Sequence, residues 1–364
     1  MAALYIDGLS APKEIKVALT NLSKTYSFSK EIDKGANGYL FFGRNRIMAT
    51  DVAVKFYYWG GQKEYHAEPR NLAAIHCKNI LSILDASFID NDWAYFVTPY
   101  CPNGDLDDYI EQTKFGNLQA IDFVSSVLTG LSHLHAQRFL HRDLKPSNIY
   151  LDNNMQAVIG DFGSLKVTPM GVDEVPSSSH SILYRPPESI LYNTYSSKGD
   201  IYQMGIVLYQ LLGGELQYDE YAWMNKAELT HYNSLTDHVD KSIYVDQCIK
   251  NRITKGRVVN LKSLPPWVPE QLKRIIRKAV NLEPTKRYGN STEFKADLHK
   301  VRPAILDWSV IDGYPILSAN TSYRIISVGD KLTVQKRKNG DWRNDKTIHG
   351  GSLNELVKNI EAKA

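Results

Sequence analysis

The most constraining feature of this sequence is a group of charged residues set among apolar, strand-like stretches between residues 141 and 163. The passage reads HRDLKPSNIYLDNNMQAVIGDFG and includes Asp143, Lys145, Asn148 and Asp161. Charged groups beside a core are unfavourable unless they pair, bind metal or take part in chemistry. The passage therefore predicts a fold that supports a functional polar site.

The composition is sufficient for a large hydrophobic core and does not indicate a particular class of binding partner. The chain has 364 residues, of which 43% are hydrophobic, and a formal charge of +3. This length suits two domains, or one two-lobed domain with an appendage. The small charge does not indicate nucleic-acid binding, because a dedicated binder usually has a strongly basic patch. The three cysteines, which lack C-x-x-C spacing, are typical of a reducing compartment. Residues 1–20 contain no apolar signal core and no stretch is long enough to span a bilayer, so we expect a cytoplasmic protein with no membrane segment.

The first third of the chain is rich in strand patterns. After a leader with the helix-like segment EIKVALTNL, aromatic and β-branched runs appear in YLFFG, DVAVKFYYW and WAYFVTPY. A helical pattern over about 62–75 interrupts them. We therefore expect a sheet here with one helix inserted.

Helical spacing dominates after about residue 103. Ile121, Val124, Leu128 and Leu131 recur on one helix face, and Asn117 is the predicted N-cap. The stretch GDIYQMGIVLYQLLGG is apolar nearly all round, which predicts a buried central helix. The segment PEQLKRIIRKAV predicts a further amphipathic helix, whereas residues 217–269 show no clear pattern.

The composition changes again at about residue 303. YRIISV and KLTVQKRK predict strands, and the Asn339-Gly340 pair favours a two-residue hairpin turn between strands. SLNELVKNIEA then predicts an amphipathic helix. These patterns indicate a small α+β module over 303–364.

HRDLKPSN followed by DFG resembles the catalytic loop and metal-binding segment of the eukaryotic-type (Hanks-type) Ser/Thr protein kinase family. The resemblance covers about 27–302, with further landmarks in the order of the family. It implies an α+β, bilobal protein kinase fold with a β-rich N-lobe and a helical C-lobe, followed by the small C-terminal α+β module. The implied divisions are a leader (1–26), an N-lobe (27–98), a hinge (99–102), a C-lobe (103–302) and the module (303–364).

The resemblance implies transfer of the ATP γ-phosphoryl group to a protein Ser or Thr hydroxyl. Asp143 would accept or orient the proton of that hydroxyl, and Lys145 would steady the transferring group. Asn148 and Asp161 would hold Mg²⁺, a cation that prefers oxygen ligands. The lysine in DLKPSN favours Ser/Thr over Tyr specificity.

The resemblance also assigns residues to the nucleotide phosphates. In VAVK, Lys55 would bridge the α- and β-phosphates and pair with Glu68, with Glu64 as the alternative; Pro69 departs from the family pattern after Glu68. In IDKGANGYL, Gly35 and Gly38 would cover the phosphates, while Asp33 replaces the first glycine of the family.

The hinge FVTPYCPNGDL would hold the adenosine. By resemblance Thr98 is the gatekeeper, and adenine would meet the carbonyl of Pro99 and the backbone of Cys101. Asp105 would bond the ribose, or would instead cap the following helix.

The segment SSSHSILYRPPES resembles the one that receives the protein substrate. Ser181 would bond Asp143 and Lys145, Glu188 would pair with Arg287, and Asp200 would hold the backbone of the catalytic loop.

Arg142 precedes the catalytic aspartate, an arrangement found in family members whose activation segment is ordered by phosphate. Ser177, Ser178 and Ser179 are candidate autophosphorylation sites.

Two other functions stay open on the sequence. A pseudokinase scaffold that binds nucleotide or protein partners would be favoured by Asp33 and Pro69, although Lys55, Asp143 and Asp161 are all present. A small-molecule kinase would usually lack the Glu188 and Arg287 pair. The 303–364 module is a candidate to bind a regulatory partner, but its basic hairpin is more typical of a solvated sheet edge.

Overall fold

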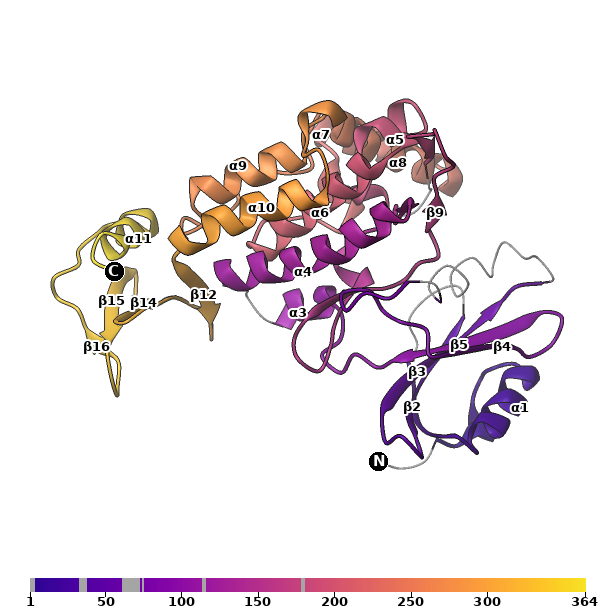
Figure 1. Ribbon diagram of the computed structural model, residues 1–364. Helices are drawn as coiled ribbons and strands as arrows, with labels where there is room; N and C mark the ends of the chain where they lie inside the picture. The colour runs from indigo at the N-terminus through magenta and orange to yellow at the C-terminus, as the bar shows by residue number, and fades with distance from the viewer. Residues whose placement is uncertain (1–3, 33–37, 61–72, 74, 113–115, 178–180) are drawn as a thin grey trace. The chain divides into compact units, whose positions relative to one another are not determined.

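The computed structural model describes residues 4–32, 38–60, 73, 75–112, 116–177 and 181–364. The chain forms two compact units: a first unit of residues 1–104 and 150–165, and a second unit of residues 105–149 and 166–364. Each unit is described by itself below (Figure 1). The domain boundaries expected from the sequence stay a prediction.

The first unit is organised around a five-stranded antiparallel sheet. Its strands, in spatial order, are β1 (Tyr26–Ile32), β2 (Tyr39–Asn45), β3 (Asp51–Tyr58), β5 (Trp93–Pro99) and β4 (Asp85–Phe88). Apolar residues alternate along β3, so that Val52, Val54 and Phe56 are buried while the residues between them are more exposed. This period of two is the physical reason for a strand with one face on a core.

A helix near the N-terminus packs into the core of the same sheet. After the 3₁₀ turn η1 (Ile6–Gly8), helix α1 (Lys13–Leu22) buries Ile15 and Leu19 in one cluster with Phe28 and Phe41. The helix expected from EIKVALTNL is therefore confirmed. The helical pattern predicted over about 62–75 falls largely outside the described residues.

The second unit is mainly helical, and its centre is the apolar helix α6. Its helices are α3 (Leu106–Gln112), α4 (Asn117–Ala136), α5 (Pro187–Leu191), α6 (Ser197–Leu211), α7 (Lys226–Ser234), α8 (His238–Thr254), α9 (Glu270–Ala279) and α10 (Ser291–Val301). Every residue of α6 from Gly199 to Leu211 is buried. Helices α4 and α9 contact α6, and α10 packs along α4. The predicted buried central helix is thus confirmed.

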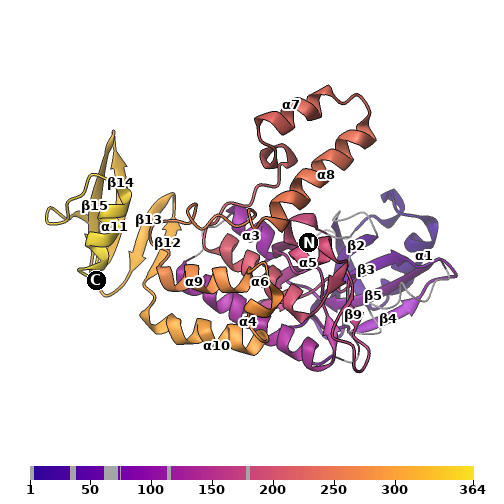
Figure 2. The same ribbon diagram turned by 90° about the horizontal axis from the view of Figure 1, so that it is seen from above.

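Helices α7 and α8 occupy the part of the sequence where no pattern was recognised. They pack against each other and extend away from the group formed by α4, α6, α9 and α10 (Figure 2). Each begins with a side-chain cap, Asn225 for α7 and Asp237 for α8. Such caps supply local start signals that the hydrophobic pattern did not contain.

Short elements complete the second unit. Two-residue strands pair as β6 (Phe139–Leu140) with β9 (Lys166–Val167), and β10 (Val175–Pro176) with β11 (Thr194–Tyr195). The 3₁₀ turns are η3 (Pro146–Asn148), η4 (Ile182–Tyr184), η5 (Glu220–Trp223), η6 (Pro284–Lys286) and η7 (Arg302–Ala304). Strand β7 (Ile149–Leu151) follows η3 and runs into the first unit, where it pairs with β8 (Ala157–Ile159).

The start of α4 corrects one expectation. Its N-cap is Gly116, and Asn117 is the first helical residue. The buried Asn117 amide instead donates to the carbonyls of Trp267 and Leu306, at 3.0 and 3.2 Å. The predicted cap was wrong: Asn117 lies inside the helix, and its side-chain N–H groups bond tertiary partners far away in sequence.

The C-terminal residues form an antiparallel sheet and a helix, as the sequence predicted. The strands follow sequence order: β12 (Asp307–Ile311), β13 (Tyr314–Ser318), β14 (Ser322–Val328), β15 (Lys331–Arg337) and β16 (Arg343–Asn344), and α11 (Leu353–Glu361) lies against β14 and β15 (Figure 1). We call residues 307–361 the tail sheet and helix.

The sheet has two tight turns that the sequence did not predict, in addition to the predicted position at Asn339-Gly340. Two-residue turns occur at Asp312-Gly313, where both φ angles are positive, and at Gly329-Asp330. At Asn339-Gly340 the register agrees with the prediction: Gln335 pairs with Asn344 and Lys336 with Arg343, which is the pairing that a two-residue turn at 339–340 gives. The strand pairing itself stops at Lys336 and Arg343, and of the two turn residues only Gly340 has a positive φ. In this register Arg337 lies opposite Trp342, and the Arg337 guanidinium stacks over the Trp342 ring at 4.5 Å.

The tail sheet and helix pack on the helical part of the second unit. The Trp308 side chain on β12 is fully buried and stacks on Trp267, with ring centres 5.9 Å apart and an angle of 22° between the rings. Its indole N–H donates to Glu361 on α11 at 2.9 Å. Together with the Asn117 bonds, these contacts form what we call the tryptophan seam.

Within the described residues, no helix combines the length and apolar character needed to cross a membrane.

Candidate active site

Three of the predicted catalytic residues meet in the second unit, between β6 and β7. Asp143 Oδ2 accepts a hydrogen bond from Asn148 Nδ2 at 3.1 Å and lies 3.2 Å from Lys145 Nζ. Asn148 Nδ2 also donates to the backbone carbonyl of Asp143 at 2.7 Å. Lys145 Nζ donates to Ser181 Oγ at 2.7 Å, so the predicted Ser181 belongs to the same cluster. We call these four side chains the Asp143 cluster.

The second carboxylate oxygen of Asp143 is unusual. Asp143 is only 6% exposed, and its Oδ1 is buried without a hydrogen-bond partner among the described residues. An unmet buried acceptor costs about 1–3 kcal/mol, and most buried polar atoms avoid that cost. This oxygen can therefore accept a hydrogen bond or a proton from a hydroxyl group that enters the site.

Two side chains of α6 fix the loop that carries the cluster. Asp200 accepts from the backbone N–H of His141 at 3.0 Å and of Arg142 at 2.9 Å, which confirms the expected tie. Gln203 accepts from the Leu144 N–H at 2.9 Å and donates to the Arg142 carbonyl at 3.2 Å. Residues three apart share a helix face, so both side chains reach the loop from one side of α6.

Sequence reasoning missed Gln203. The signal that could have identified it is a polar residue, one turn after Asp200, inside an otherwise apolar helix. Such a residue needs partners, and here the loop backbone supplies them.

The Asp200 carboxylate is fully buried and bonded on several sides. His135 Nε2 lies 2.8 Å from Oδ2, and the Tyr195 hydroxyl donates to Oδ1 at 2.8 Å. Burial by itself would raise the pKa of Asp200, but the hydrogen bond and positive charge of His135, with the charge of His141 and the Arg142 N–H, lower the pKa below its usual value. The group therefore stays ionised at neutral pH and remains a strong acceptor for the loop.

In the first unit, Lys55 and Asp161 come together from positions far apart in the chain. Lys55 Nζ, on β3, lies 3.8 Å from Asp161 Oδ1, which follows β8. The ammonium also lies 5.6 Å from the centre of the Phe96 ring, opposite Lys55 on β5. Both charged side chains remain partly exposed, with 32% and 43% of their surface accessible. They are therefore accessible to a charged ligand.

The backbone around Asp161 is held in place by the segment that follows Cys77. Asn79 Nδ2 donates to the Ala157 carbonyl at 3.0 Å, and backbone bonds join Ile159 to Asn79 and Leu81 at 2.9 and 2.8 Å. Asp161 itself has φ of +53°, a strained conformation for a residue with a side chain. The bonded β8 backbone leads directly into this conformation.

The predicted hinge continues from β5. Thr98 is 5% exposed and lies opposite Ala53 on β3, and Pro99 lies opposite Val52. Cys101 is partly buried, and burial together with the nearby Asp152 carboxylate raises the pKa of its thiol to about 11. This thiol is neutral at physiological pH, so it is a poor nucleophile.

Only some of the remaining predicted nucleotide-binding positions lie in the described part of the chain. A Cβ on Gly38 would lie 2.2 Å from the Phe56 carbonyl, so the close approach of β3 already requires glycine there. Asp105 accepts from the N–H groups of Asp107 and Asp108 at 3.0 Å each, which makes it the cap of α3. Glu68, the alternative Glu64 and Gly35 lie outside the described residues.

The activation segment has one described candidate serine. Ser177 Oγ donates to the Asn193 side chain at 2.7 Å, and Arg142 Nη1 donates to the neighbouring Pro176 carbonyl at 3.0 Å. Ser178 and Ser179 lie outside the described part of the chain. Arg142 is thus close in space to the backbone that leads into this segment.

The expected Glu188 and Arg287 pair is confirmed. The guanidinium donates to both carboxylate oxygens at 2.7 Å, and both side chains are buried. Arg287 also donates to the backbone carbonyls of Asn281 and Lys198 and lies 4.9 Å from the Tyr202 ring. A further bond to the Leu282 carbonyl at 3.4 Å gives all five donors of the guanidinium an acceptor, which indicates a structural role.

With this geometry in place, comparison with known proteins decides the family. The family model for the protein kinase domain matches residues 26–298. The chain belongs to the protein kinase family. Its fold is the β-sheet and helical combination of that family, and the tail sheet and helix lie beyond the match.

Several curated relatives are named as Ser/Thr kinases. The chain is 26% identical to serine/threonine-protein kinase PrkC of Bacillus subtilis over 287 residues, 76% of this chain and 40% of that protein. It is 32% identical to the RAF proto-oncogene serine/threonine-protein kinase of Xenopus laevis over 205 residues, 52% of this chain and 31% of the relative. It is 34% identical to human serine/threonine-protein kinase Nek11 over 131 residues, which are 35% of this chain and 20% of that protein. The match thus spans less than half the length of each of these relatives.

Proposed function

We propose that this chain is a Ser/Thr protein kinase, which transfers the γ-phosphoryl group of ATP to serine or threonine hydroxyls of proteins. The observation that carries the proposal is the Asp143 cluster, with one carboxylate oxygen fixed by Asn148 and Lys145 and the other buried without a partner among the described residues. Family membership and the names of the relatives agree with it.

The unpartnered Asp143 Oδ1 suits the hydroxyl of the acceptor residue. A hydrogen bond from that hydroxyl would satisfy the buried oxygen, orient the nucleophile and accept its proton as transfer proceeds. Lys145 would place its positive charge beside the transferring phosphoryl group. Its bond to Ser181 links this charge to the segment that receives the substrate.

Asn148 and Asp161 are the proposed ligands of Mg²⁺. Asn148 donates twice through Nδ2, so its amide oxygen is the atom that can ligate a cation, and Asp161 offers a partly exposed carboxylate. No group of three His, Cys, Asp or Glu side chains suited to a metal occurs among the described residues. That fits Mg²⁺, which usually takes one or two protein ligands and completes its shell with phosphates and water. When bound, the ion would neutralise charge on the phosphate oxygens.

Lys55 is the proposed ligand of the α- and β-phosphates. Its 3.8 Å separation from Asp161 leaves both groups able to exchange their mutual attraction for contacts with a metal-bound nucleotide. Glu68 is proposed as the carboxylate partner of Lys55, and Gly35 and Gly38 as the glycines that cover the phosphates.

Adenosine is proposed to bind along the segment after β5. The Pro99 carbonyl and the Cys101 backbone would contact adenine, and the buried Thr98 would limit the depth of that contact. The ribose role of Asp105 stays a proposal beside its observed role as a helix cap.

The proposed kinase is also expected to phosphorylate its own activation segment, at Ser177, Ser178 or Ser179. Arg142 would then exchange its bond to the Pro176 carbonyl for a stronger, charge-assisted contact with the phosphate. A cytoplasmic location and a regulatory partner for the C-terminal module stay predictions from the sequence.

Labelled phosphate transfer tests the proposal. Purified protein, ATP labelled at the γ-phosphate, Mg²⁺ and a mixed Ser/Thr/Tyr peptide pool should give labelled phosphoserine or phosphothreonine, identified by phosphoamino-acid analysis. Asp143→Asn should reduce transfer by at least about a hundredfold, because it removes the proton acceptor but keeps the shape. Mass spectrometry of the same two proteins should find activation-segment phosphate only in the wild type.

The control is Asp240→Asn, which changes an exposed carboxylate on α8 in the same unit. It should transfer phosphate at the wild-type rate. The proposal fails if the wild type transfers no phosphate, or if Asp143→Asn transfers as fast as Asp240→Asn. Label on tyrosine alone would contradict the Ser/Thr assignment.

A further inference from the structure

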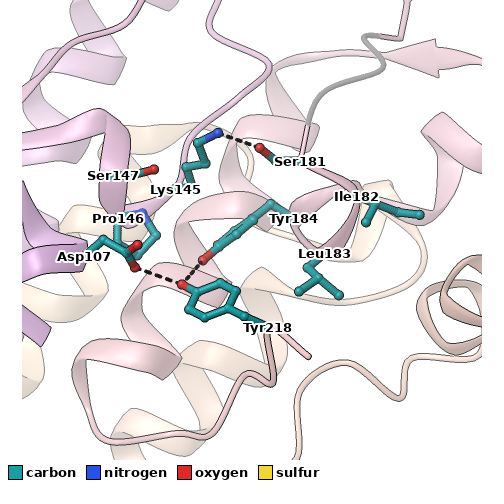
Figure 3. Close-up of a pocket in the computed structure, with 9 residues that line it drawn as sticks. All are labelled: Asp107, Lys145, Pro146, Ser147, Ser181, Ile182, Leu183, Tyr184 and Tyr218. Atoms are coloured by element: carbon teal, nitrogen blue, oxygen red, sulfur yellow. Dashed lines mark hydrogen bonds between the residues drawn. The ribbon is translucent and has the colours of Figure 1, made fainter. Parts of the chain in front are cut away.

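A pocket of about 270 Å³ lies directly beside the Asp143 cluster (Figure 3). Lys145 and Ser181 belong both to that cluster and to the lining of the pocket. An extended peptide advances about 3.3–3.6 Å per residue. A substrate whose hydroxyl meets Asp143 can therefore place a side chain from within about three residues of the acceptor into this pocket.

The walls of the pocket are largely apolar, but they include one fixed carboxylate. Pro146 and the rings of Tyr184 and Tyr218 supply apolar surface, and Asp107, in the first turn of α3, is the only acidic side chain among the described residues that line it. Lys145, which is the one cation among the lining residues that the structure describes, already contacts Asp143 and Ser181. The negative charge of Asp107 therefore sets the electrostatic preference of the pocket.

A chain of side-chain hydrogen bonds holds Asp107 in position. The Tyr218 hydroxyl donates to Asp107 Oδ1 at 2.9 Å, accepts from Gln210 Nε2 at 3.1 Å and lies 3.1 Å from the Tyr184 hydroxyl. Tyr184 donates to Gln210 Oε1 at 2.8 Å. Burial raises the pKa of Tyr218, so its hydroxyl stays protonated and remains a donor at neutral pH.

We propose, resting on the kinase function proposed above, that this pocket selects an arginine side chain of the protein substrate and that Asp107 determines this specificity. The arginine stem is apolar and suits walls of proline and tyrosine. Its planar guanidinium can stack on a tyrosine ring and donate two hydrogen bonds to a carboxylate. Ser147, which also lines the pocket, has no charge, so the selection depends on Asp107.

A position-scanning peptide library measures the preference. Each position from three before to three after a central serine is varied, and the rate of phosphate transfer is recorded for each residue. Arginine should be preferred at one of these positions by about tenfold over norleucine, since a hydrogen-bonded charge contact changes selectivity by about that factor. Selection of an apolar residue, or of none, would overturn the proposal.

Variants test whether Asp107 is responsible. The quantity measured is the ratio of kcat/KM for the arginine peptide to kcat/KM for the matched norleucine peptide, which cancels general loss of activity. Asp107→Asn should bring this ratio close to one. In Asp107→Lys, kcat/KM for a matched glutamate peptide should exceed kcat/KM for the arginine peptide. Tyr218→Phe keeps the charge but removes the bond that fixes it, so the ratio should fall only in part.

The matched control is Asp108→Asn, which changes the adjacent carboxylate on α3, outside the lining of the pocket. It should keep the wild-type ratio. An equal fall in Asp108→Asn and Asp107→Asn would overturn the assignment, because the effect would then come from the general charge of α3.

Binding separates this inference from the proposed function. A fluorescent arginine peptide with alanine in place of serine cannot accept phosphate, so its affinity does not depend on catalysis. Its Kd should rise about tenfold in Asp107→Asn and stay constant in Asp108→Asn. If no phosphate transfer occurs but this difference in Kd is found, the kinase proposal fails and the arginine pocket stands. If transfer occurs but Asp107→Asn changes neither the Kd nor the ratio of kcat/KM values, only the arginine proposal fails.

Discussion

At the scale of single residues, two charged side chains that are adjacent in the sequence contribute very differently to the stability of the fold. Arg287 is fully buried and its guanidinium makes two bonds to Glu188, whereas the side chain of the adjacent Lys286 is 61% exposed and pairs with Glu283 at 2.7 Å. A buried pair that loses one member leaves an uncompensated charge, while an exposed pair is screened by water. The two positions therefore form a matched test within one 3₁₀ turn and its cap.

Arg287→Ala should lower the free energy of unfolding by about 3–5 kcal/mol, because it strands the Glu188 carboxylate in the core. Lys286→Ala should lower it by less than about 1 kcal/mol. Urea unfolding followed by circular dichroism measures both. Similar losses in the two variants would show that burial does not govern this pair.

At the scale of elements, helices α6 and α9 meet at a glycine. A Cβ added to Gly205 would lie 2.7 Å from Val280 Cγ1 and 2.8 Å from Ala279 Cβ, closer than side-chain atoms normally approach. The absence of a side chain at Gly205 therefore permits the close contact between the two helices.

Gly205→Ala should destabilise the protein by about 1–3 kcal/mol, although alanine favours a helix more than glycine does. The reason is the clash with α9. Ala279→Gly removes the opposing methyl, so the double variant should lose less stability than the sum of the single variants. Urea unfolding of all four proteins gives the coupling free energy, and strict additivity would contradict the packing argument.

The helices and strands also show how much of the fold could be predicted from the sequence. Periodicity located α4, α6, α9, β14, β15 and α11 because each has one dominant apolar pattern. It failed at the start of α4, where the distant carbonyls of Trp267 and Leu306 bond the Asn117 side chain. Local preference is weak against such tertiary contacts.

In the candidate site too, local motifs were predictable from the sequence and tertiary contacts were not. Fixed motifs placed Asp143, Lys145 and Asn148 within a few residues of one another, so their clustering was predictable. The role of Gln203 and the pocket around Asp107 were not predictable, because they depend on the face that α6 presents and on the position of the loop after α6.

At the scale of the whole molecule, the tryptophan seam makes the C-terminal residues part of the stability of the second unit. Trp308→Ala should lower the free energy of unfolding by about 3–5 kcal/mol, because it removes a fully buried ring and uncovers Trp267. Thermal unfolding of the full chain measures the loss. Trp342→Ala, a tryptophan of the same sheet but away from the seam, is the control and should lose clearly less. Equal losses would show that the tryptophan seam contributes no more to stability than another tryptophan of the same sheet.

Synthesis on the ribosome gives the seam a further consequence. Asn117 and Trp267 leave the exit tunnel well before Leu306 and Trp308, their partners in the finished structure. During that interval the nascent chain carries an uncovered indole and an amide short of one acceptor, both of which favour association with other chains. The time spent translating the intervening codons, and the chaperones present then, should thus influence how much usable protein a cell obtains.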